Sequence, residues 1–87
     1  MSVDQRFEAA VETLKSFTKR PSDTEFLELY GLYKQITAGD INKPRPGMMD
    51  LRAKAKWDSW KSREGMSKDA AKEAYAKHID TLSAKYK

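Results

Sequence analysis

The chain has 87 residues, which is enough for one domain with one hydrophobic core. It contains no cysteine, which excludes a disulfide framework and a thiolate zinc site. Its 17 Lys and Arg residues against 13 Asp and Glu residues give a net charge of +4, which permits nucleic acid, anionic lipid or a phosphorylated small molecule as partner.

Composition also bears on where the protein acts. Small secreted domains usually need disulfide bonds, so a chain without cysteine fits a reducing compartment better. The N-terminal stretch has no uninterrupted apolar segment of the signal-peptide type, and no apolar run approaches the length that crosses a bilayer. With a mean hydropathy of -0.83, the chain is expected to be a soluble cytoplasmic protein.

Two helices are predicted in the first half of the chain. Each begins after a serine, Ser2 and Ser22, that is followed three residues later by Gln or Glu, the spacing of a capping box. Pro21 ends the first helix or separates it from the second, and Gly39 is a natural residue to follow the second. Apolar residues recur at intervals of three and four along the first helix: Val3, Phe7, Ala10, Val11, Leu14 and Phe17.

The second half begins with a Gly- and Pro-rich loop over about residues 39–50. Within it, residues 45–48 fit a type II turn with Pro and Gly at the central positions. A third helix is predicted from about Asp50 to Glu64, ending at Gly65, and a fourth opens with Ser67 as its N-cap. Apolar and aromatic residues at helical spacing mark the fourth helix: Ala71, Ala74, Tyr75, His78, Ile79, Leu82 and Tyr86.

Loop lengths constrain the arrangement of these helices. The connections near Pro21 and Gly65 are short, so they are expected to join antiparallel neighbours. A loop of about 12 residues reaches on the order of 40 Å, whereas the second helix is only about 25 Å long. The loop over residues 39–50 can therefore run back along that helix and let the second and third helices lie parallel. Because no strand pattern appears, the expected fold class is all-α, a four-helix bundle.

Tyr30, Tyr33 and Lys34 stand at positions i, i+3 and i+4, which places two phenol rings and one ammonium on the same helical face. Lys54 and Lys56, two residues apart, point to different sides of the third helix. Aromatic surface beside positive charge suits a ligand that carries a planar base and phosphates. The tyrosines are equally consistent with the edge of a core, where the ring is buried and the hydroxyl meets water.

Signs of catalysis are missing from the sequence. His78 is the only histidine and has no nucleophile at a recognisable spacing, so a boundary position on a helix is the preferred interpretation. The carboxylates show no paired arrangement for acid–base chemistry, and no phosphate loop or metal-ligand cluster occurs. Trp57 and Trp60, at i and i+3, are expected to fill the core. The chain is therefore not expected to be an enzyme or to hold a metal.

Four motifs carry a resemblance to a known family: Y-x-x-Y-K-Q at residues 30–35, G-D-I-N at 39–42, R-P-G-M at 45–48 and K-A-K-W-D-x-W at 54–60. In these the chain resembles the acyl-CoA-binding protein family, and the match covers nearly its whole length. The resemblance selects the up-down-down-up order of helices and implies one acyl-CoA-binding domain over residues 1–87. Ala53 and Arg52 depart from the family pattern, which leaves preferences for chain length or headgroup open.

The resemblance implies a carrier of medium- and long-chain fatty acyl-CoA esters that maintains an acyl-CoA pool, with no other cofactor. It implies a monomer that does not bind nucleic acid and that contacts acyl-CoA-using enzymes or membranes transiently. The 3′-phosphorylated adenosine head would be held by Lys15, Tyr30, Tyr33, Lys34, Lys56 and Tyr75. The acyl chain would lie in a groove lined by Phe7, Ala10, Val11, Phe26, Leu27 and Ala55.

The composition leaves one rival from another class: a small basic helical domain that binds nucleic acid or an anionic membrane surface. Its basic side chains would contact phosphates and its exposed aromatic rings would stack on bases. Such a domain should lose affinity steeply as salt increases and should ignore acyl length. A carrier should respond to acyl length above all.

Overall fold

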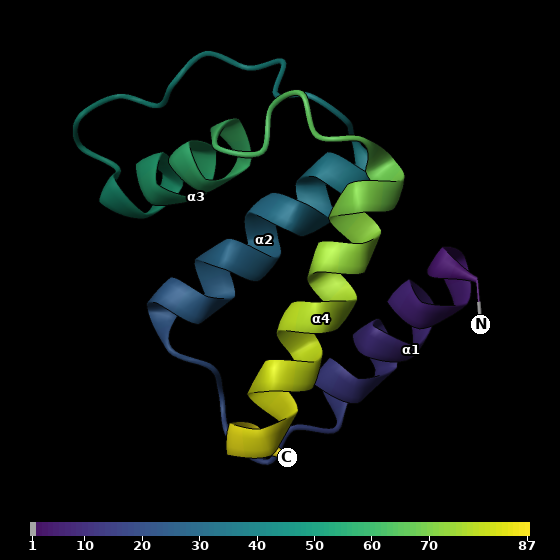
Figure 1. Cartoon of the computed structure of the whole chain (residues 1–87). Helices are drawn as coiled ribbons and strands as arrows, with labels where there is room; N and C mark the ends of the chain where they lie inside the picture. Colours follow the sequence, from purple (N-terminus) through teal and green to yellow (C-terminus); the bar gives the residue numbers. More distant parts are fainter. Residues whose placement is uncertain (1) are drawn as a thin grey trace.

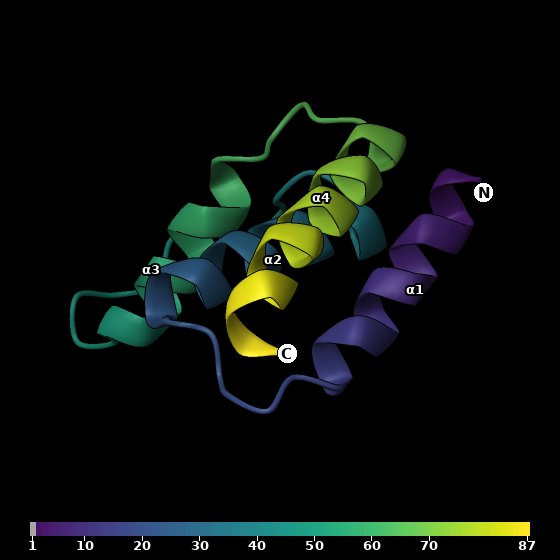
Figure 2. The same cartoon turned by 60° about the horizontal axis from the view of Figure 1, so that its bottom comes forward.

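The computed structural model describes residues 2–87, and this part of the chain contains four helices and no strand. They are α1 (Val3–Lys15), α2 (Asp23–Thr37), α3 (Leu51–Lys61) and α4 (Lys68–Tyr86). Figures 1 and 2 show α1 and α4 running in one direction and α2 and α3 in the other, which confirms the up-down-down-up order. The all-α four-helix bundle expected from the sequence is confirmed.

Local capping explains where the helices begin. The side chains of four residues accept a hydrogen bond from a backbone N–H three positions later: Ser2, Ser22, Asp50 and Ser67. In α1 and α2 the capping boxes are complete, because the side chain at that third position also accepts from the cap's own N–H. The predicted ends were less accurate, since α1 stops at Lys15 and α3 at Lys61, each followed by a turn.

The helices joined by the two short connections do not pack along each other. Instead α4 packs on both α1 and α2, and α2 packs on α3, so α4 lies between α1 and α2 (Figure 1). The backbone N–H of Thr18 donates to the carbonyl of Tyr86 over 2.9 Å, so the connection between α1 and α2 passes beneath the end of α4. The expectation that short loops join packed neighbours was wrong.

Burial along α4 explains this arrangement. Its side chains Ala71, Tyr75, Ile79 and Leu82 are almost fully buried, and they meet Leu29, Leu32 and Ile36 of α2 and Ala10 of α1 in one core. A helix that is apolar on two sides gains most when it is covered on both. The apolar surface that α4 buries against α1 and α2 therefore decides which helices pack together, and the short loops do not.

The α2–α3 contact depends on a glycine. A Cβ added to Gly31 would lie 2.5 Å from the carbonyl oxygen of Ser59 and 2.7 Å from its Oγ, so the two helices approach too closely for any larger residue. At the same place the Ser59 hydroxyl donates to the carbonyl of Leu27. The backbones of α2 and α3 are thus in direct contact, which fixes the distance between their side chains elsewhere.

The loop between α2 and α3 is fastened to α3 by side chains of that helix. The indole N–H of Trp57 donates to the carbonyl of Lys43, and that of Trp60 to the carbonyl of Gly39, each over 2.8 Å. Arg45 forms two hydrogen bonds to Asp58, of 3.0 and 2.9 Å. These contacts hold the loop beside α3, which allows α2 and α3 to run in the same direction.

The chain reversal in this loop differs from the one expected. Gly47 does not have a positive φ, so the type II turn predicted over residues 45–48 was wrong. The N–H of Asp50 donates to the carbonyl of Gly47 over 3.3 Å, which makes Met48 and Met49 the central residues of the turn. The chain thus reverses only after it has passed the contact between Arg45 and Asp58.

Candidate functional site

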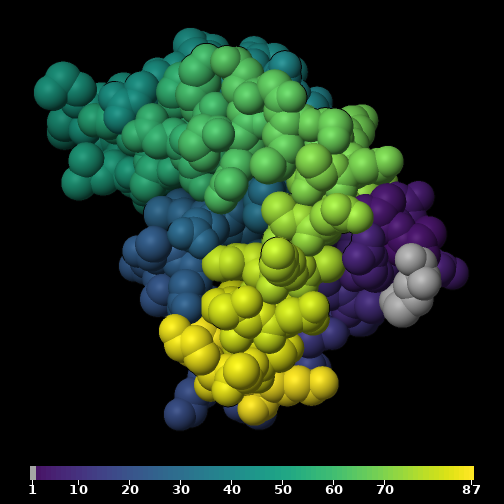
Figure 3. All heavy atoms as spheres, in the orientation of Figure 1, coloured from purple at the N-terminus to yellow at the C-terminus, as the bar shows by residue number. Residues whose placement is uncertain are grey.

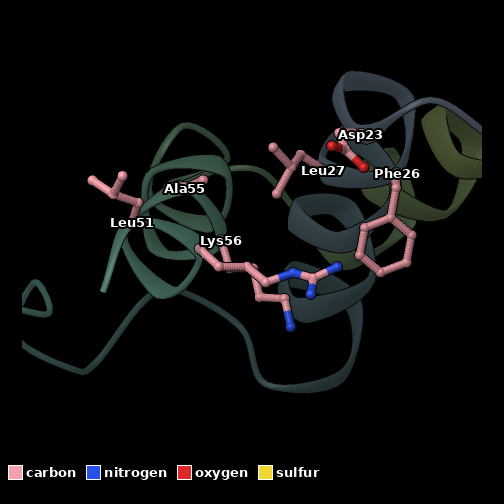
Figure 4. A pocket seen from close by; sticks show the side chains of 7 residues that line it. Asp23, Phe26, Leu27, Leu51, Ala55 and Lys56 are labelled. Carbon is pink, nitrogen blue, oxygen red and sulfur yellow. The ribbon is translucent and has the colours of Figure 1, made fainter. Parts of the chain in front are cut away.

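Three cavities surround α2, and we name them by the elements that line them. The α2–α3 cavity has a volume of about 350 Å³ (Figure 4), the aromatic cavity about 260 Å³ and the loop cavity about 220 Å³. Phe26 lines the first two, Tyr30 the last two, and Lys56 the first and third, so the cavities adjoin one another. Together they form a hollow of the size that small-molecule sites have in proteins.

The aromatic cavity lies among α1, α2 and α4. Its lining consists of Val11, Leu14, Lys15, Phe26, Leu29, Tyr30, Tyr33 and Tyr75. The rings of Tyr33 and Tyr75 have centroids 6.3 Å apart, and the ring of Phe7 meets that of Tyr75 edge-on at 5.2 Å. Such contacts between rings fix their orientation. The cavity therefore presents flat aromatic surface that is already in place.

The two phenols of this cluster differ in exposure. Tyr33 is 43% exposed, whereas Tyr75 is only 3% exposed. Burial, with a smaller contribution from the charge of Tyr33, raises the pKa of Tyr75 to about 12. The Tyr75 hydroxyl is therefore protonated at neutral pH and can donate a hydrogen bond to a ligand in the cavity.

Two lysines of the expected site lie over aromatic rings. The Lys56 Nζ is 5.5 Å from the centroid of the Tyr30 ring, and the Lys34 Nζ is 4.9 Å from that of Trp60. Neither ammonium forms an ion pair with the residues that the structure describes, where the paired lysines are Lys15, Lys61, Lys72 and Lys85. Both charges are thus free to meet an anion.

The structure brings most of the expected head-binding residues together. Lys15, Tyr30, Tyr33 and Tyr75 line the aromatic cavity, and Lys56 joins Tyr30 in the loop cavity. Lys34 lines neither cavity and approaches the loop cavity only through Trp60. The Lys15 ammonium lies 3.2 Å from Glu12 on the surface of α1, and exposed pairs of this kind hold a side chain weakly.

Five of the six residues expected in the acyl groove fall into three groups. Phe26, Leu27 and Ala55 line the α2–α3 cavity, and Figure 4 shows Leu27 and Ala55 on the two helices that form its walls. Val11 lines the aromatic cavity, next to Phe26. Phe7 packs against Tyr33 and Tyr75 and lines none of the three cavities.

Ala10 does not belong with this set. It is 6% exposed and lines a separate cavity between α1 and α4, together with Arg6, Ala9, Thr13, Ala76 and Asp80. Ala10 and Val11 are consecutive on α1, and consecutive residues point about 100° apart on a helix. The expectation that both line one groove is therefore not met by the geometry.

Sequence reasoning missed three residues that line the α2–α3 cavity: Asp23, Leu51 and Arg52. Leu51 precedes Ala55 by four residues, so the spacing alone places both on one face of α3. This signal was present in the sequence. Asp23 and Arg52 could not have been assigned in the same way, because their position depends on how α2 and α3 meet.

Residues 2–87 contain neither a membrane-spanning helix nor a cluster of metal ligands. None of the four helices is both long and apolar enough to cross a bilayer. No three His, Cys, Asp or Glu side chains in this part of the chain gather in an arrangement that could hold a metal ion.

Comparison with known proteins agrees with this geometry. The family model described as acyl CoA binding protein matches residues 4–79. A relative in a species of Hypsibius is 51% identical over 98% of this chain and 96% of its own length. The acyl-CoA-binding protein homolog of Drosophila melanogaster is 49% identical over 97% of this chain and 98% of its own.

Solved structures give the same result. The solution structure of the acyl CoA binding protein from Babesia bovis is 47% identical, covers 97% of this chain and 96% of its own, and superposes with a TM-score of 0.80. The crystal structure of Oryza sativa Acyl-CoA-Binding Protein 2 is 38% identical, covers 93% of this chain and 90% of its own, and gives a TM-score of 0.84. The chain described here belongs to the acyl-CoA-binding protein family.

Proposed function

We propose that this protein binds coenzyme A esters of medium- and long-chain fatty acids and acts as their carrier and pool former. One observation carries the proposal: the α2–α3 cavity, whose apolar lining is Phe26, Leu27, Leu51 and Ala55, shares Phe26 with the aromatic cavity and Lys56 with the loop cavity. A ligand with a charged aromatic head and an apolar tail can occupy both at once. The family match supports the same chemistry.

The head of the ligand would occupy the aromatic and loop cavities. We assign adenine stacking to the rings of Tyr30 and Tyr33, and a hydrogen bond to the Tyr75 hydroxyl. The ammonium groups of Lys15, Lys34 and Lys56 would neutralise the phosphates. A charge-assisted hydrogen bond of this kind contributes about 1.5–3 kcal/mol, more than a bond between neutral groups.

The acyl chain would follow the α2–α3 cavity, along Phe26, Leu27, Leu51 and Ala55. Each buried methylene contributes about 0.8 kcal/mol, so about 14 of them give on the order of 11 kcal/mol before costs. Association entropy and the ordering of a flexible chain offset a large part of this. Length discrimination then arises in the cavity, while the head provides specificity for coenzyme A.

A carrier fits this site better than an enzyme. The hollow is lined by lysines, phenols and apolar side chains. Asp23 is the one carboxylate in the lining of the three cavities, and no histidine lines them, so the pair of groups that acid–base catalysis needs is missing there. We further propose a monomeric cytoplasmic protein whose residues 1–87 form one domain. Delivery of its ligand would involve transient contact with acyl-CoA-using enzymes or membranes.

The rival function, binding of nucleic acid or an anionic membrane surface in place of acyl-CoA, gains no support from the family match. The matched relatives whose names state a ligand are acyl-CoA-binding proteins.

Calorimetric titration tests the proposal directly. Free coenzyme A, a graded series of acyl-CoA esters, the corresponding free fatty acids and a short oligonucleotide would be compared at physiological salt. Acyl-CoA esters should bind far more tightly than free coenzyme A or the free acids. An oligonucleotide that displaced acyl-CoA at equal concentration would refute the carrier and support the rival.

A further inference from the structure

The large apolar side chains that face solvent are concentrated in one place. Met48 is 84% exposed, Met49 98% and Leu51 75%, whereas Tyr33 in the aromatic cavity is 43% exposed. Met48 and Met49 are the central residues of the turn before α3, and Figure 4 shows Leu51 pointing away from α2. In Figure 3 the teal segment that contains this turn projects from one end of the molecule. We call these three residues the rim patch.

The rim patch lies within the part of the chain that carries the excess charge. Residues 43–56 include five basic side chains and one acidic side chain, a net of +4: Lys43, Arg45, Arg52, Lys54, Lys56 and Asp50. The whole chain has 17 basic and 13 acidic residues, so the remainder holds 12 of each and is balanced. This segment therefore carries a net charge equal to that of the whole chain, with Arg45 paired to Asp58 just beyond it.

The rim patch also borders the proposed acyl site. Leu51, together with its neighbour Arg52, lines the α2–α3 cavity while most of its surface faces solvent. It therefore stands at the mouth of that cavity. Met48 and Met49, just before Leu51 in the chain, contribute little to packing within residues 2–87, because 84% and 98% of their surfaces remain uncovered.

We propose that the rim patch is a docking site for the surface of an anionic phospholipid bilayer. Met48, Met49 and Leu51 would enter the boundary between headgroups and acyl chains, and the surrounding lysines and arginines would meet the anionic headgroups. Docked in this way, the mouth of the α2–α3 cavity faces the bilayer. An acyl chain then passes between bilayer and cavity without crossing water, a consequence that rests on the proposed carrier function.

Other occupants fit this surface less well. A second copy of the chain would bring two segments of net charge +4 together, and like charges repel. Nucleic acid would use the basic side chains but not methionine and leucine, which offer no flat ring for a base. Only a surface that is both anionic and apolar within a few ångströms matches the whole patch.

Vesicle binding of the ligand-free protein tests the inference separately from acyl-CoA binding. The full chain would be sedimented with unilamellar vesicles of phosphatidylcholine alone and of phosphatidylcholine mixed with phosphatidylserine, without any acyl-CoA. The protein should bind the mixed vesicles, more weakly as salt increases, and should bind neutral vesicles at least about tenfold less tightly. Equal binding to both kinds of vesicle, or binding to neither, would overturn the inference.

A pair of matched variants tests the apolar part. Met48→Ser with Met49→Ser should weaken binding to mixed vesicles by about tenfold or more, whereas Met48→Leu with Met49→Leu should preserve it. Neither methionine lines a cavity of the proposed site, so both variants should keep their calorimetric affinity for acyl-CoA in solution. Unchanged vesicle binding by the serine variant would contradict the proposal. Self-association that the serine substitutions abolish would do so too, in favour of a second copy.

Discussion

Lys54 and Lys56 show how much a single residue's role depends on the direction in which it points. The sequence placed them on different sides of α3, and the family resemblance assigned the ligand to Lys56. In the structure Lys56 lines two of the three cavities and lies over the Tyr30 ring, whereas Lys54 lines none of the three. Two identical side chains on one helix thus provide a natural comparison.

We expect Lys56→Ala to weaken acyl-CoA binding by about 1.5–3 kcal/mol, the contribution of a hydrogen bond to a charged group. Lys54→Ala, the matched control, should alter the affinity by much less, since its ammonium lies outside the hollow. Calorimetric titration of both variants measures the difference, and thermal unfolding checks that each remains folded. Equal losses of affinity would show that general charge, not the site, is responsible.

At the scale of residues, sequence reasoning succeeded where the interacting partner is close in the chain. The caps at Ser2 and Ser22 bond to groups three positions away, so they are visible in a short window. The indole N–H groups of Trp57 and Trp60 bond to carbonyls 14 and 21 positions away, and only their bulk could be foreseen. Both tryptophans hold the loop, a role that required the fold. Only Trp60 is buried, whereas Trp57 is half-buried, so the expectation that both fill the core was wrong for Trp57.

Among the elements, α2 and α3 are held at a distance set by Gly31. Replacement by alanine would favour the helical conformation by about 1 kcal/mol. The added Cβ would nevertheless lie 2.5 Å from the carbonyl oxygen of Ser59, so the two backbones would have to separate. We expect Gly31→Ala to lower the free energy of unfolding by about 1–3 kcal/mol, measured by chemical denaturation.

Gly47→Ala is the control for this experiment. A Cβ on Gly47 would meet nothing within 4 Å, and the residue does not have a positive φ. Its substitution should leave stability unchanged or slightly increased, because alanine restricts the unfolded chain more than glycine does. If Gly31→Ala changed the free energy of unfolding as little as Gly47→Ala, the inference that Gly31 lies against Ser59 would be refuted.

The N-terminus of α2 is tied to the C-terminus of α4 by Glu25. Its carboxylate accepts hydrogen bonds from the Tyr86 hydroxyl at 2.5 Å and from the Lys85 ammonium at 2.9 Å, besides its role in the capping box. These contacts lower the pKa of Glu25 to about 2 from an ordinary value of 4.5, and the hydrogen bond from Tyr86 makes the largest contribution. The ionised form is therefore favoured in the folded state.

A lowered pKa in the folded state stabilises the protein above the pKa of the unfolded state, and this stabilisation is lost as the carboxylate is protonated. For Glu25 the loss should occur as pH falls from about 4.5 to about 2. Glu25→Gln should be less stable than the parent protein at neutral pH and should show a smaller decline over this interval. Thermal unfolding as a function of pH measures both effects.

A control at an exposed carboxylate, Asp80→Asn on α4, should retain the parent's decline in stability over the same interval. Asp80 forms no ion pair with the residues that the structure describes, where the paired acids are Asp4, Glu12, Glu25, Glu28, Asp58, Glu64 and Glu73. If Glu25→Gln and the parent protein declined in parallel, the contact with Tyr86 would not be what lowers the pKa.

The elements themselves were predictable from periodicity and caps, but their packing was not. Four helices in the right places follow from local patterns in the sequence. Which helices touch is decided by the sum of buried surface, and the apolar face of α4 is wide enough to contact both α1 and α2. A short connection limits how far apart two helix ends lie, but it does not oblige the helices to pack side by side.

In the whole molecule, the aromatic cavity and the α2–α3 cavity lie on different sides of α2, one facing α1 and α4 and the other facing α3. The aromatic cavity depends on three helices and is held by ring contacts, whereas the α2–α3 cavity depends on the loop-bound helix α3. The family resemblance supplied the set of head-binding residues. It could not show that the expected groove is divided, because that division follows from the tilt and spacing of the helices.

This division predicts that chain length and headgroup recognition can be altered separately. In the parent protein, affinity should rise by at most about tenfold for every two added methylenes and should level off when the α2–α3 cavity is full. Ala55 lines this cavity but neither of the others. A phenylalanine at this position, Ala55→Phe, would occupy part of the space available to the acyl chain.

We therefore expect the affinity of the Ala55→Phe variant to stop rising at a shorter acyl chain than that of the parent protein. Its affinity for free coenzyme A should be unchanged. Ala84→Phe, an exposed position of α4 outside the three cavities, is the control and should leave the whole length series unaltered. Calorimetric titration of each variant with acyl-CoA esters of increasing length gives the plateau. If the Ala55→Phe series matched that of the parent protein, the acyl chain would not lie between α2 and α3. If free coenzyme A also lost affinity, the two parts of the site would not be separable.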